Sequence, residues 1–157
     1  MKQESVKVVS SNRKAHHEYF IEDTLEAGIV LTGTEIKSIR AGHVSIQESF
    51  VAYASGELWI QGMHISAYDP GHGENHEPLR PRKLLMHDSE IIRWSERAQQ
   101  RGYTIIPLRL YLKHGRAKVE IGLGKGKKLY DKRQSIAQKD ARRNVERAIG
   151  DHQRGRR

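Results

Sequence analysis

The chain has 157 residues, enough for one domain of ordinary size, and 36% of them are hydrophobic. Cysteine is absent, which excludes a disulfide scaffold, a thiolate metal site and cysteine-based catalysis. The 28 Lys and Arg residues exceed the 19 Asp and Glu residues and give a net charge of +9. No apolar run approaches the roughly 18 residues needed to cross a bilayer, so we expect a soluble, cytoplasmic protein.

The positive charge is concentrated in the second half of the chain. Residues 79–157 have 22 Lys or Arg and 8 Asp or Glu, a net charge of +14, whereas residues 1–78 have a net charge of −5. A basic surface attracts polyanions, and nucleic acid is the commonest polyanion in cells. The alternative is a solvated surface that only keeps the protein soluble, but so strong an asymmetry favours a polyanion partner.

The first elements predicted from the pattern are a strand and a short helix. Residues 1–10 show no clear pattern and are expected to be frayed. Alternation of apolar and polar residues predicts a strand over 17–31, with a bulge near Ala27-Gly28. Thr34 is placed to cap a helix that stops at Gly42.

A hairpin, a loop and a longer helix are expected next. An extended segment over 44–53 leads to Ser55-Gly56, which predicts a hairpin turn. Residues 69–82 hold three of the four prolines and predict a long loop. Asp88 is placed to cap a helix that runs through Arg101.

The last predicted element of the body is a second hairpin. Residues 103–113 and 116–123 alternate with period two and are joined by His114-Gly115. Pro107 predicts a sheet edge or a kink in the first of these strands. Five or six strands in hairpins favour a mainly β fold, a small OB-fold-like closed barrel with one or two peripheral helices. A ferredoxin-like sandwich is the alternative, because helices separate some of the strands.

The tail after the last hairpin differs in composition. Residues 131–157 have 9 Lys or Arg and 4 Asp or Glu. Placed on a helix, their apolar stripe is too thin to hold the helix alone in water. We therefore expect a basic C-terminal tail that is disordered when free and helical when bound to a polyanion.

Nine histidines suggest a metal site, but their spacing is weak support for one. His72 and His76 share a loop, and His16 and His17 are adjacent, yet no third ligand accompanies them in a fixed register. Surface histidines explain this pattern better, and no metal or other cofactor is expected.

Two other patterns resemble catalytic or phosphate-binding motifs only in part. The segment 122–128, GLGKGKK, has three residues between Gly122 and Gly126 where a phosphate-binding loop has four. It is interpreted as a flexible hinge to the tail. Paired carboxylates such as Glu26 with Glu35 lack a nucleophile or metal ligand nearby in sequence and are mostly interpreted as exposed surface groups.

Several blocks of sequence, in a fixed order, carry a resemblance to one family. They are NRKAHHEYFIEDTLEAGIVLTGTEIKSIRAG at 12–42, RPRKLLMH at 80–87, KVEIGLGKGKKLYDKR at 118–133, and the basic tail. Together they resemble the SsrA-binding protein family, also called small protein B, the partners of transfer-messenger RNA in bacteria. The resemblance implies a flexible N-terminus at 1–11, an OB-fold RNA-binding barrel at 12–130 and a ribosome-binding tail at 131–157.

The resemblance also implies a function without catalysis or cofactor. The protein would bind the transfer-RNA-like domain of transfer-messenger RNA and deliver it to stalled ribosomes for trans-translation. Its tail would sense the empty message channel beside the decoding centre of the small subunit. Elongation factor Tu with GTP would join through the aminoacylated RNA, and the protein would act as a monomer. The alternatives are a general OB-type binder of single-stranded or ribosomal RNA, and a Mg²⁺-dependent RNA-processing enzyme.

The family's RNA-binding positions can be carried over to this sequence. Asn12, His17, Glu26 and Leu85 match them, and such side chains can accept from, donate to or pack on an unstacked base. For Leu85 a place in the core is an equal alternative. Phosphate contacts are expected from the cations Arg13, Lys14, Lys83, Lys125, Lys127 and Lys128. Ribosome contacts are expected from Gly126, Tyr130, Asp131, Lys132, Arg133, Lys139, Arg142, Arg143 and Arg147.

Overall fold

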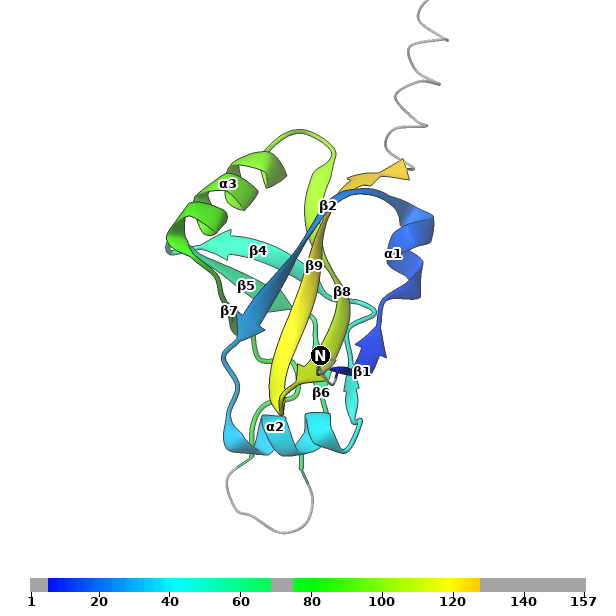
Figure 1. Ribbon diagram of the computed structural model, residues 1–157, viewed down its shortest axis with the longest axis vertical. Coiled ribbons are helices and arrows are strands. Elements are labelled where there is room, and N and C mark those ends of the chain that lie inside the picture. The colour runs from blue at the N-terminus through cyan, green and yellow to red at the C-terminus, as the bar shows by residue number, and fades with distance from the viewer. Residues whose placement is uncertain (1–5, 69–74, 128–157) are drawn as a thin grey trace, which may run out of the picture.

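A computed structural model describes residues 6–68 and 75–127 of the chain (Figure 1). The described residues form nine strands and three helices. The strands are β1 (Val6–Ser11), β2 (Tyr19–Ile29), β3 (Val44–Ser45), β4 (Phe50–Ala54), β5 (Glu57–Gln61), β6 (His64–Ile65), β7 (Arg82–Leu85), β8 (Tyr103–Lys113) and β9 (Arg116–Gly126). The helices are α1 (Arg13–Glu18), α2 (Gly33–Arg40) and α3 (Asp88–Ala98). None of these helices is long and apolar enough to cross a membrane.

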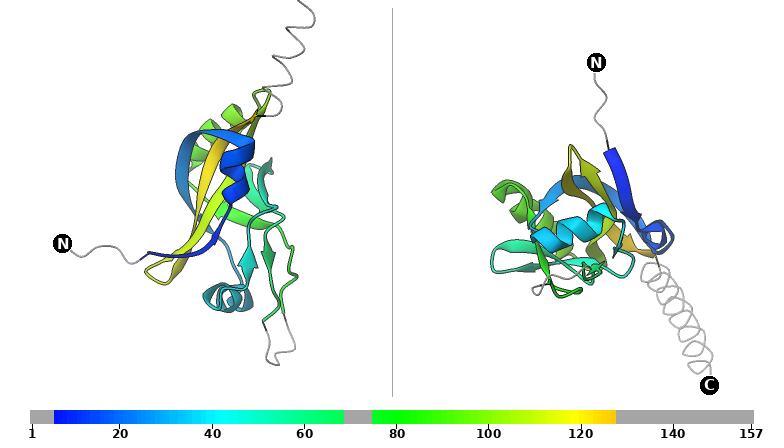
Figure 2. Two further views of the ribbon diagram at one scale, coloured as in Figure 1. Left: turned by 90° about the vertical axis from the view of Figure 1, so that its right-hand side faces the viewer. Right: turned by 90° about the horizontal axis from the view of Figure 1, so that it is seen from below.

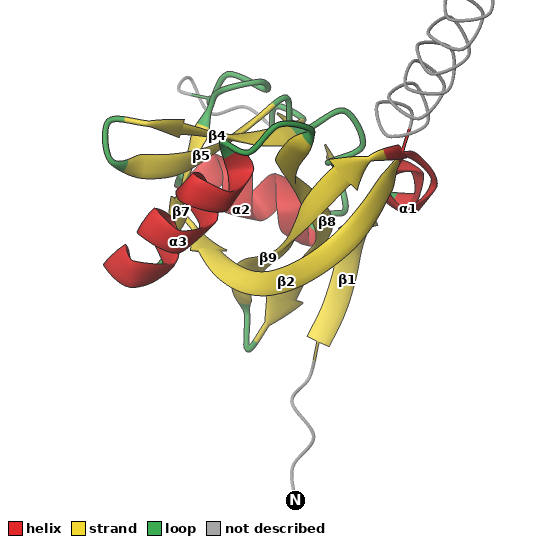
Figure 3. Ribbon diagram, turned by 90° about the horizontal axis from the view of Figure 1, so that it is seen from above, coloured by secondary structure: helices red, strands yellow, loops and turns green. Residues whose placement is uncertain are grey.

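The main sheet closes on itself. Its hydrogen-bonded order is β1-β8-β4-β5-β7-β2-β9, and β8 also pairs with β9 along its whole length. The ring therefore runs from β8 through β4, β5, β7 and β2 to β9 and back, while β1 adds to the end of β8. This ring confirms the mainly β, barrel-like prediction over the ferredoxin-like alternative, with three helices where one or two were expected (Figure 3).

One continuous core fills the ring and extends to two of the helices. Leu110 and Ile121 point inward from β8 and β9 and are fully or almost fully buried. Ile39 brings α2 across one end of the barrel, and Trp94 joins α3 to the same cluster (Figures 1 and 2). Helix α2 starts at Thr32, whose hydroxyl accepts from the Glu35 backbone N–H while the Glu35 carboxylate accepts from the Thr32 N–H. The predicted cap at Thr34 is therefore wrong, because the reciprocal capping pair needs the spacing from Thr32 to Glu35.

A second, smaller apolar cluster lies on the outside of the sheet under α1. Ala15 of α1 packs there on Ile106 and Leu108 of β8, with Tyr19 and Ile21 of β2 alongside. The sequence analysis missed α1, because RKAHHE offers only one apolar side chain to set a helical period.

Two bulges make this outer cluster possible. The register of β2 shifts between Ile21 and Asp23, and that of β8 shifts between Pro107 and Arg109. The bulge predicted at Ala27-Gly28 is thus at another position, and Pro107 marks a kink inside a central strand rather than an edge. An extra residue in each strand turns its apolar side chains from the core to the outer face.

Two glycines of β9 leave room for those side chains. A Cβ on Gly122 would lie 2.8 Å from Leu108 Cδ1, and one on Gly124 would lie 3.0 Å from Ile106 Cδ1. The glycine-rich segment, interpreted as a hinge from the sequence, is strand from Gly122 to Gly126 because its glycines serve packing.

Both predicted hairpin turns are confirmed by their backbone angles. Ser55 and Gly56 have φ values of 53° and 77°, and His114 and Gly115 have 51° and 75°. Two positive φ values in succession give the turn that matches the twist of paired strands.

Five predicted boundaries are wrong. Val6–Ser11 pair with β8 and are not a frayed N-terminus. The single strand expected over 44–53 is two strands, β3 and β4, and β7 begins at Arg82 inside the expected loop. Helix α3 ends at Ala98, three residues earlier than predicted, and His87 occupies the N-cap position expected of Asp88. Strands β1, β3 and β7 were not predicted because each pairs with a strand far away in sequence.

Candidate nucleic-acid interface

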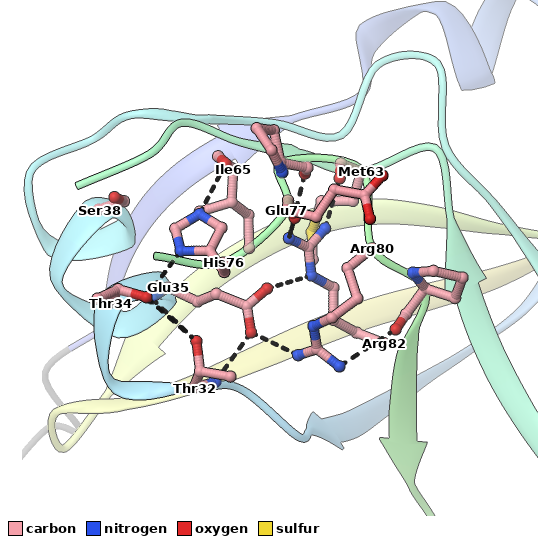
Figure 4. A network of polar contacts seen from close by, with 12 residues as sticks. Thr32, Thr34, Glu35, Ser38, Met63, Ile65, His76, Glu77, Arg80 and Arg82 are labelled. Atoms are coloured by element: carbon pink, nitrogen blue, oxygen red, sulfur yellow. Dashed lines mark hydrogen bonds and ion pairs between the residues drawn. The ribbon is translucent and has the colours of Figure 1, made fainter. Parts of the chain in front are cut away.

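A buried ion-pair network fixes β7, the strand that carries two predicted RNA contacts. Glu35 and Arg82 have no exposed surface, and Arg82 Nε donates to Glu35 Oε2 at 2.5 Å (Figure 4). The rest of the Arg82 guanidinium donates to the carbonyl oxygens of Met63, Glu77 and Pro78. Arg80 donates to the other Glu35 oxygen. The expectation that Glu35 is an exposed surface carboxylate is therefore wrong.

The electrostatics of the network favour the charged form of Glu35. Burial alone would raise the pKa of Glu35, but hydrogen bonds from Arg80, the Thr32 N–H and Arg82 outweigh it and hold the pKa below its ordinary value. Burial lowers the pKa of Arg82, against the opposing effect of Glu35. A buried pair whose remaining polar atoms are hydrogen-bonded fixes the geometry around it.

His76 is a structural histidine beside this network. Its Nε2 lies 2.8 Å from the Ile65 carbonyl oxygen and its Nδ1 lies 2.8 Å from Thr34 Oγ1. A carbonyl oxygen only accepts, so Nε2 carries the proton and, in the neutral ring, Nδ1 accepts from the threonine hydroxyl. Within the described part of the chain, no three His, Cys, Asp or Glu side chains gather as metal ligands would.

Leu85 is an exposed aliphatic side chain between two grooves. It is 53% exposed, which decides against a place in the core. One groove, of about 390 Å³, is lined by Leu85, Glu26, His87 and Lys118 among others. The other, of about 330 Å³, also includes Leu85 and Lys118 and extends to Arg116. Leu85 and Glu26, far apart in sequence, thus line the same depression.

Glu26 belongs to a polar cluster spread over three adjacent strands. It lies opposite Glu120 in the pairing of β2 with β9. Tyr111 of β8 donates its hydroxyl hydrogen to Glu26 Oε2, and Lys113 Nζ is 3.6 Å from Glu26 Oε1. Arg109 donates to Glu120 at 3.0 Å, an ion pair that raises the pKa of Arg109. Burial and the bond to Glu26 raise the pKa of Tyr111. The sequence analysis missed Tyr111, Arg109 and Glu120, because no sequence pattern indicates pairing across three strands.

Two of the predicted cations, Lys125 and Lys127, lie near α1 at the end of β9. Lys127 Nζ donates to the His16 carbonyl oxygen at 2.9 Å and lies 5.0 Å from the Phe20 ring centre. Lys125 Nζ lies 5.7 Å from the ring centre of Tyr103 and pairs in register with Phe20. These aromatic rings and ammonium groups form a cationic edge next to the exposed His17.

The remaining described cations that were expected to bind phosphate contact other parts of the protein or only solvent; they are Arg13, Lys14 and Lys83. Arg13 and Lys14 are exposed on α1, and Lys14 is 3.3 Å from Glu48. Lys83 is on β7, two residues before Leu85, and is 3.5 Å from Glu57. Gly126 ends β9 opposite Tyr19.

Asn12, which is expected to contact a base, is buried in this structure. Its side chain is 4% exposed, and Nδ2 donates to the Pro107 carbonyl oxygen at 3.2 Å. This bond ties the start of α1 to the bulge of β8, while the buried Oδ1 of Asn12 has no hydrogen-bond partner among the described residues. The remaining predicted residues lie outside the described ranges: Lys128, Tyr130, Asp131, Lys132, Arg133, Lys139, Arg142, Arg143 and Arg147, as do His72 and the expected tail.

Comparisons with known proteins agree with one another. Residues 9–151 match the family described as SmpB protein. A curated relative named SsrA-binding protein, from Bacillus velezensis, is 57% identical over 151 residues and covers 96% of this chain and 97% of the relative. Another of that name, from Desulfitobacterium hafniense, is 53% identical over 155 residues and covers 99% of each chain. A solved structure described as "tmRNA-SmpB: a journey to the center of the bacterial ribosome" contains a chain with 45% identity and a TM-score of 0.63, over 74% of this chain and 82% of that one.

Proposed function

This chain belongs to the SmpB protein family, and on that premise we propose that it binds the transfer-RNA-like domain of transfer-messenger RNA and delivers it to stalled ribosomes for trans-translation. The names of the relatives and of the similar structure support this function. The observation that carries it is that the exposed Leu85 lines the same groove as Glu26. Leu85 is on β7, and the buried ion pair of Arg82 with Glu35 fixes the first residue of that strand.

The chemistry of that surface suits a folded RNA with unstacked bases. An exposed leucine offers an apolar face to a base, and a carboxylate accepts from base amino groups and from 2′-hydroxyl groups but repels phosphate. Lys125 and Lys127 of the cationic edge supply contacts to the RNA phosphate backbone that do not depend on the RNA sequence. We propose that His17, Lys83, Lys125 and Lys127 contact RNA in this way, with Arg13 and Lys14 contributing charge.

The tail and the partners belong to the same proposal. Residues 131–157, with 9 Lys or Arg and 4 Asp or Glu, would bind ribosomal phosphates in the decoding centre and the vacant message channel. Elongation factor Tu with GTP would arrive on the aminoacylated RNA, and the protein would act as a non-catalytic monomer in the cytoplasm.

Binding of a labelled transfer-RNA-like domain tests the RNA-binding half of the proposal. Leu85→Ala and Glu26→Gln are expected to weaken binding about tenfold, whereas Ile92→Ala, which truncates a side chain exposed to 58% on α3, leaves binding unchanged. Log affinity should fall with log salt at roughly 0.7–0.9 per phosphate contact. Equal competition by ordinary transfer RNA would instead support a general OB-type RNA-binding protein.

Truncation after Lys128 tests the division between barrel and tail. The truncated protein is expected to bind RNA almost as the full chain does and to lose activity in a ribosome-rescue assay. Loss of RNA binding in that truncation would contradict the division.

A further inference from the structure

Tyr111 is a buried tyrosine whose hydroxyl group reaches a proposed RNA contact two strands away. It alternates along β8 with Leu110 and Leu112, which pack into the barrel core, so its own side chain lies on the outer face. It is nevertheless only 4% exposed. Its hydroxyl donates to Glu26 Oε2 across β9, the strand that separates β8 from β2 (Figure 1).

The neighbours of Glu26 explain why the hydrogen bond from Tyr111 matters for the orientation of the Glu26 carboxylate. Glu26 and Glu120 lie directly opposite each other, an arrangement of like charges that drives the two side chains apart. Arg109 holds Glu120 at 3.0 Å, and its guanidinium lies 5.4 Å from the Tyr111 ring centre. Tyr111 gives Glu26 Oε2 a neutral donor, while Lys113 Nζ lies 3.6 Å from Glu26 Oε1.

We propose that Tyr111 is a positioning residue for RNA recognition, which orients the Glu26 carboxylate so that its remaining lone pairs face the groove beside Leu85. The proposal rests on the proposed function, since it concerns the same surface. A carboxylate held in place before binding loses less conformational freedom when it accepts from an RNA amino or hydroxyl group. A flexible glutamate would also accept bonds at random angles and discriminate less well among donors.

The chain offers a control for the loss of a tyrosine hydroxyl elsewhere on the barrel. Tyr53 of β4 is 52% exposed and lines neither of the two grooves beside Leu85. Tyr53→Phe therefore removes a phenol hydroxyl without touching Glu26.

The experiment measures affinity for the transfer-RNA-like domain in a double-mutant cycle. Tyr111→Phe keeps the ring and is expected to weaken binding about fivefold, while Tyr53→Phe stays within about twofold of wild type. Tyr111→Phe combined with Glu26→Ala should bind no more weakly than Glu26→Ala alone, because the alanine leaves the hydroxyl no acceptor at this position. Glu26→Asp, which keeps the charge but withdraws it from the hydroxyl, should resemble Tyr111→Phe.

The outcomes separate this inference from the function on which it rests. If Glu26→Gln weakens binding but Tyr111→Phe or Glu26→Asp binds like wild type, the positioning role is refuted and the RNA-binding function stands. Equal losses from Tyr111→Phe in the wild-type and Glu26→Ala backgrounds refute it too, since they indicate a general structural effect. If the wild-type protein does not bind the RNA, the proposed function itself fails.

Discussion

The buried pair of Glu35 and Arg82 gives the strongest prediction about stability. Glu35→Gln leaves an amide that can accept from only one of the two guanidinium groups and that places an NH₂ donor against another donor. Arg80 is 34% exposed and can turn to solvent, but Arg82 has no exposed surface and keeps its charge buried. Removing one partner of a buried pair costs about 3–5 kcal/mol. For a chain of this size, that corresponds to a fall of about 9–15 °C in the thermal midpoint.

The pH dependence of the same variant gives an independent check. The pKa of Glu35 in the folded protein lies below its ordinary value of 4.5, so between these two values the unfolded chain binds more protons than the folded one. The stability that Glu35 contributes is present above pH 4.5 and is lost as the pH falls through the folded pKa. The difference between wild type and Glu35→Gln should therefore shrink in that window, by at most about 1.4 kcal/mol per pH unit.

Urea unfolding at several pH values, followed by circular dichroism, measures both effects. The matched control is Glu48→Gln, because Glu48 is 82% exposed and its partner Lys14 is 61% exposed. That variant is expected to unfold like wild type. A Glu35→Gln protein within about 1 kcal/mol of wild type, or with an unchanged pH profile, would refute the role given to the buried pair.

Further predictions concern packing, the start of α1 and a buried phenol. Gly122→Ala should destabilise by about 1–3 kcal/mol in thermal unfolding, because its Cβ would meet Leu108 at 2.8 Å, whereas Gly33→Ala, with nothing within 4 Å, should be neutral or stabilising. Equal effects of the two would contradict the packing role of Gly122. Asn12→Ala should cost about 1 kcal/mol of stability yet leave RNA affinity unchanged at a temperature where the protein is folded, and a loss of affinity would restore Asn12 as a contact. Burial and Glu26 raise the pKa of Tyr111, so its hydroxyl should stay protonated in the folded protein at alkaline pH. An ultraviolet titration of the tyrosines should therefore have the same reversible part in wild type and in Tyr111→Phe.

The sequence predicted the elements whose conformation depends on neighbouring residues in the chain. The two hairpin turns follow from residues that tolerate positive φ, and the long strands β8 and β9 follow from apolar residues that alternate over part of each strand. Helix α1 and strand β7 are short and depend on distant partners, Ile106 and Leu108 for the first and the Glu35–Arg82 pair for the second. Their sequences alone hold too few residues to indicate a period.

The site shows the same limit. A resemblance over four blocks identified Glu26 and Leu85, and the fold brings them to one groove. It could not show that Asn12 is buried, because an asparagine before a helix has the same appearance whether its amide faces solvent or a strand. The resemblance also could not predict the hydrogen bond from Tyr111 to Glu26. This bond crosses β9 and depends on the register of β9 with both β2 and β8.

Sequencing the RNA bound to the protein in its native cell tests the central claim most directly. After crosslinking and stringent purification, transfer-messenger RNA should be the dominant enriched species, with contacts in its transfer-RNA-like domain. A protein carrying both Glu26→Gln and Leu85→Ala should lose that enrichment while remaining folded. Recovery of ribosomal or messenger RNA without transfer-messenger RNA would contradict the account.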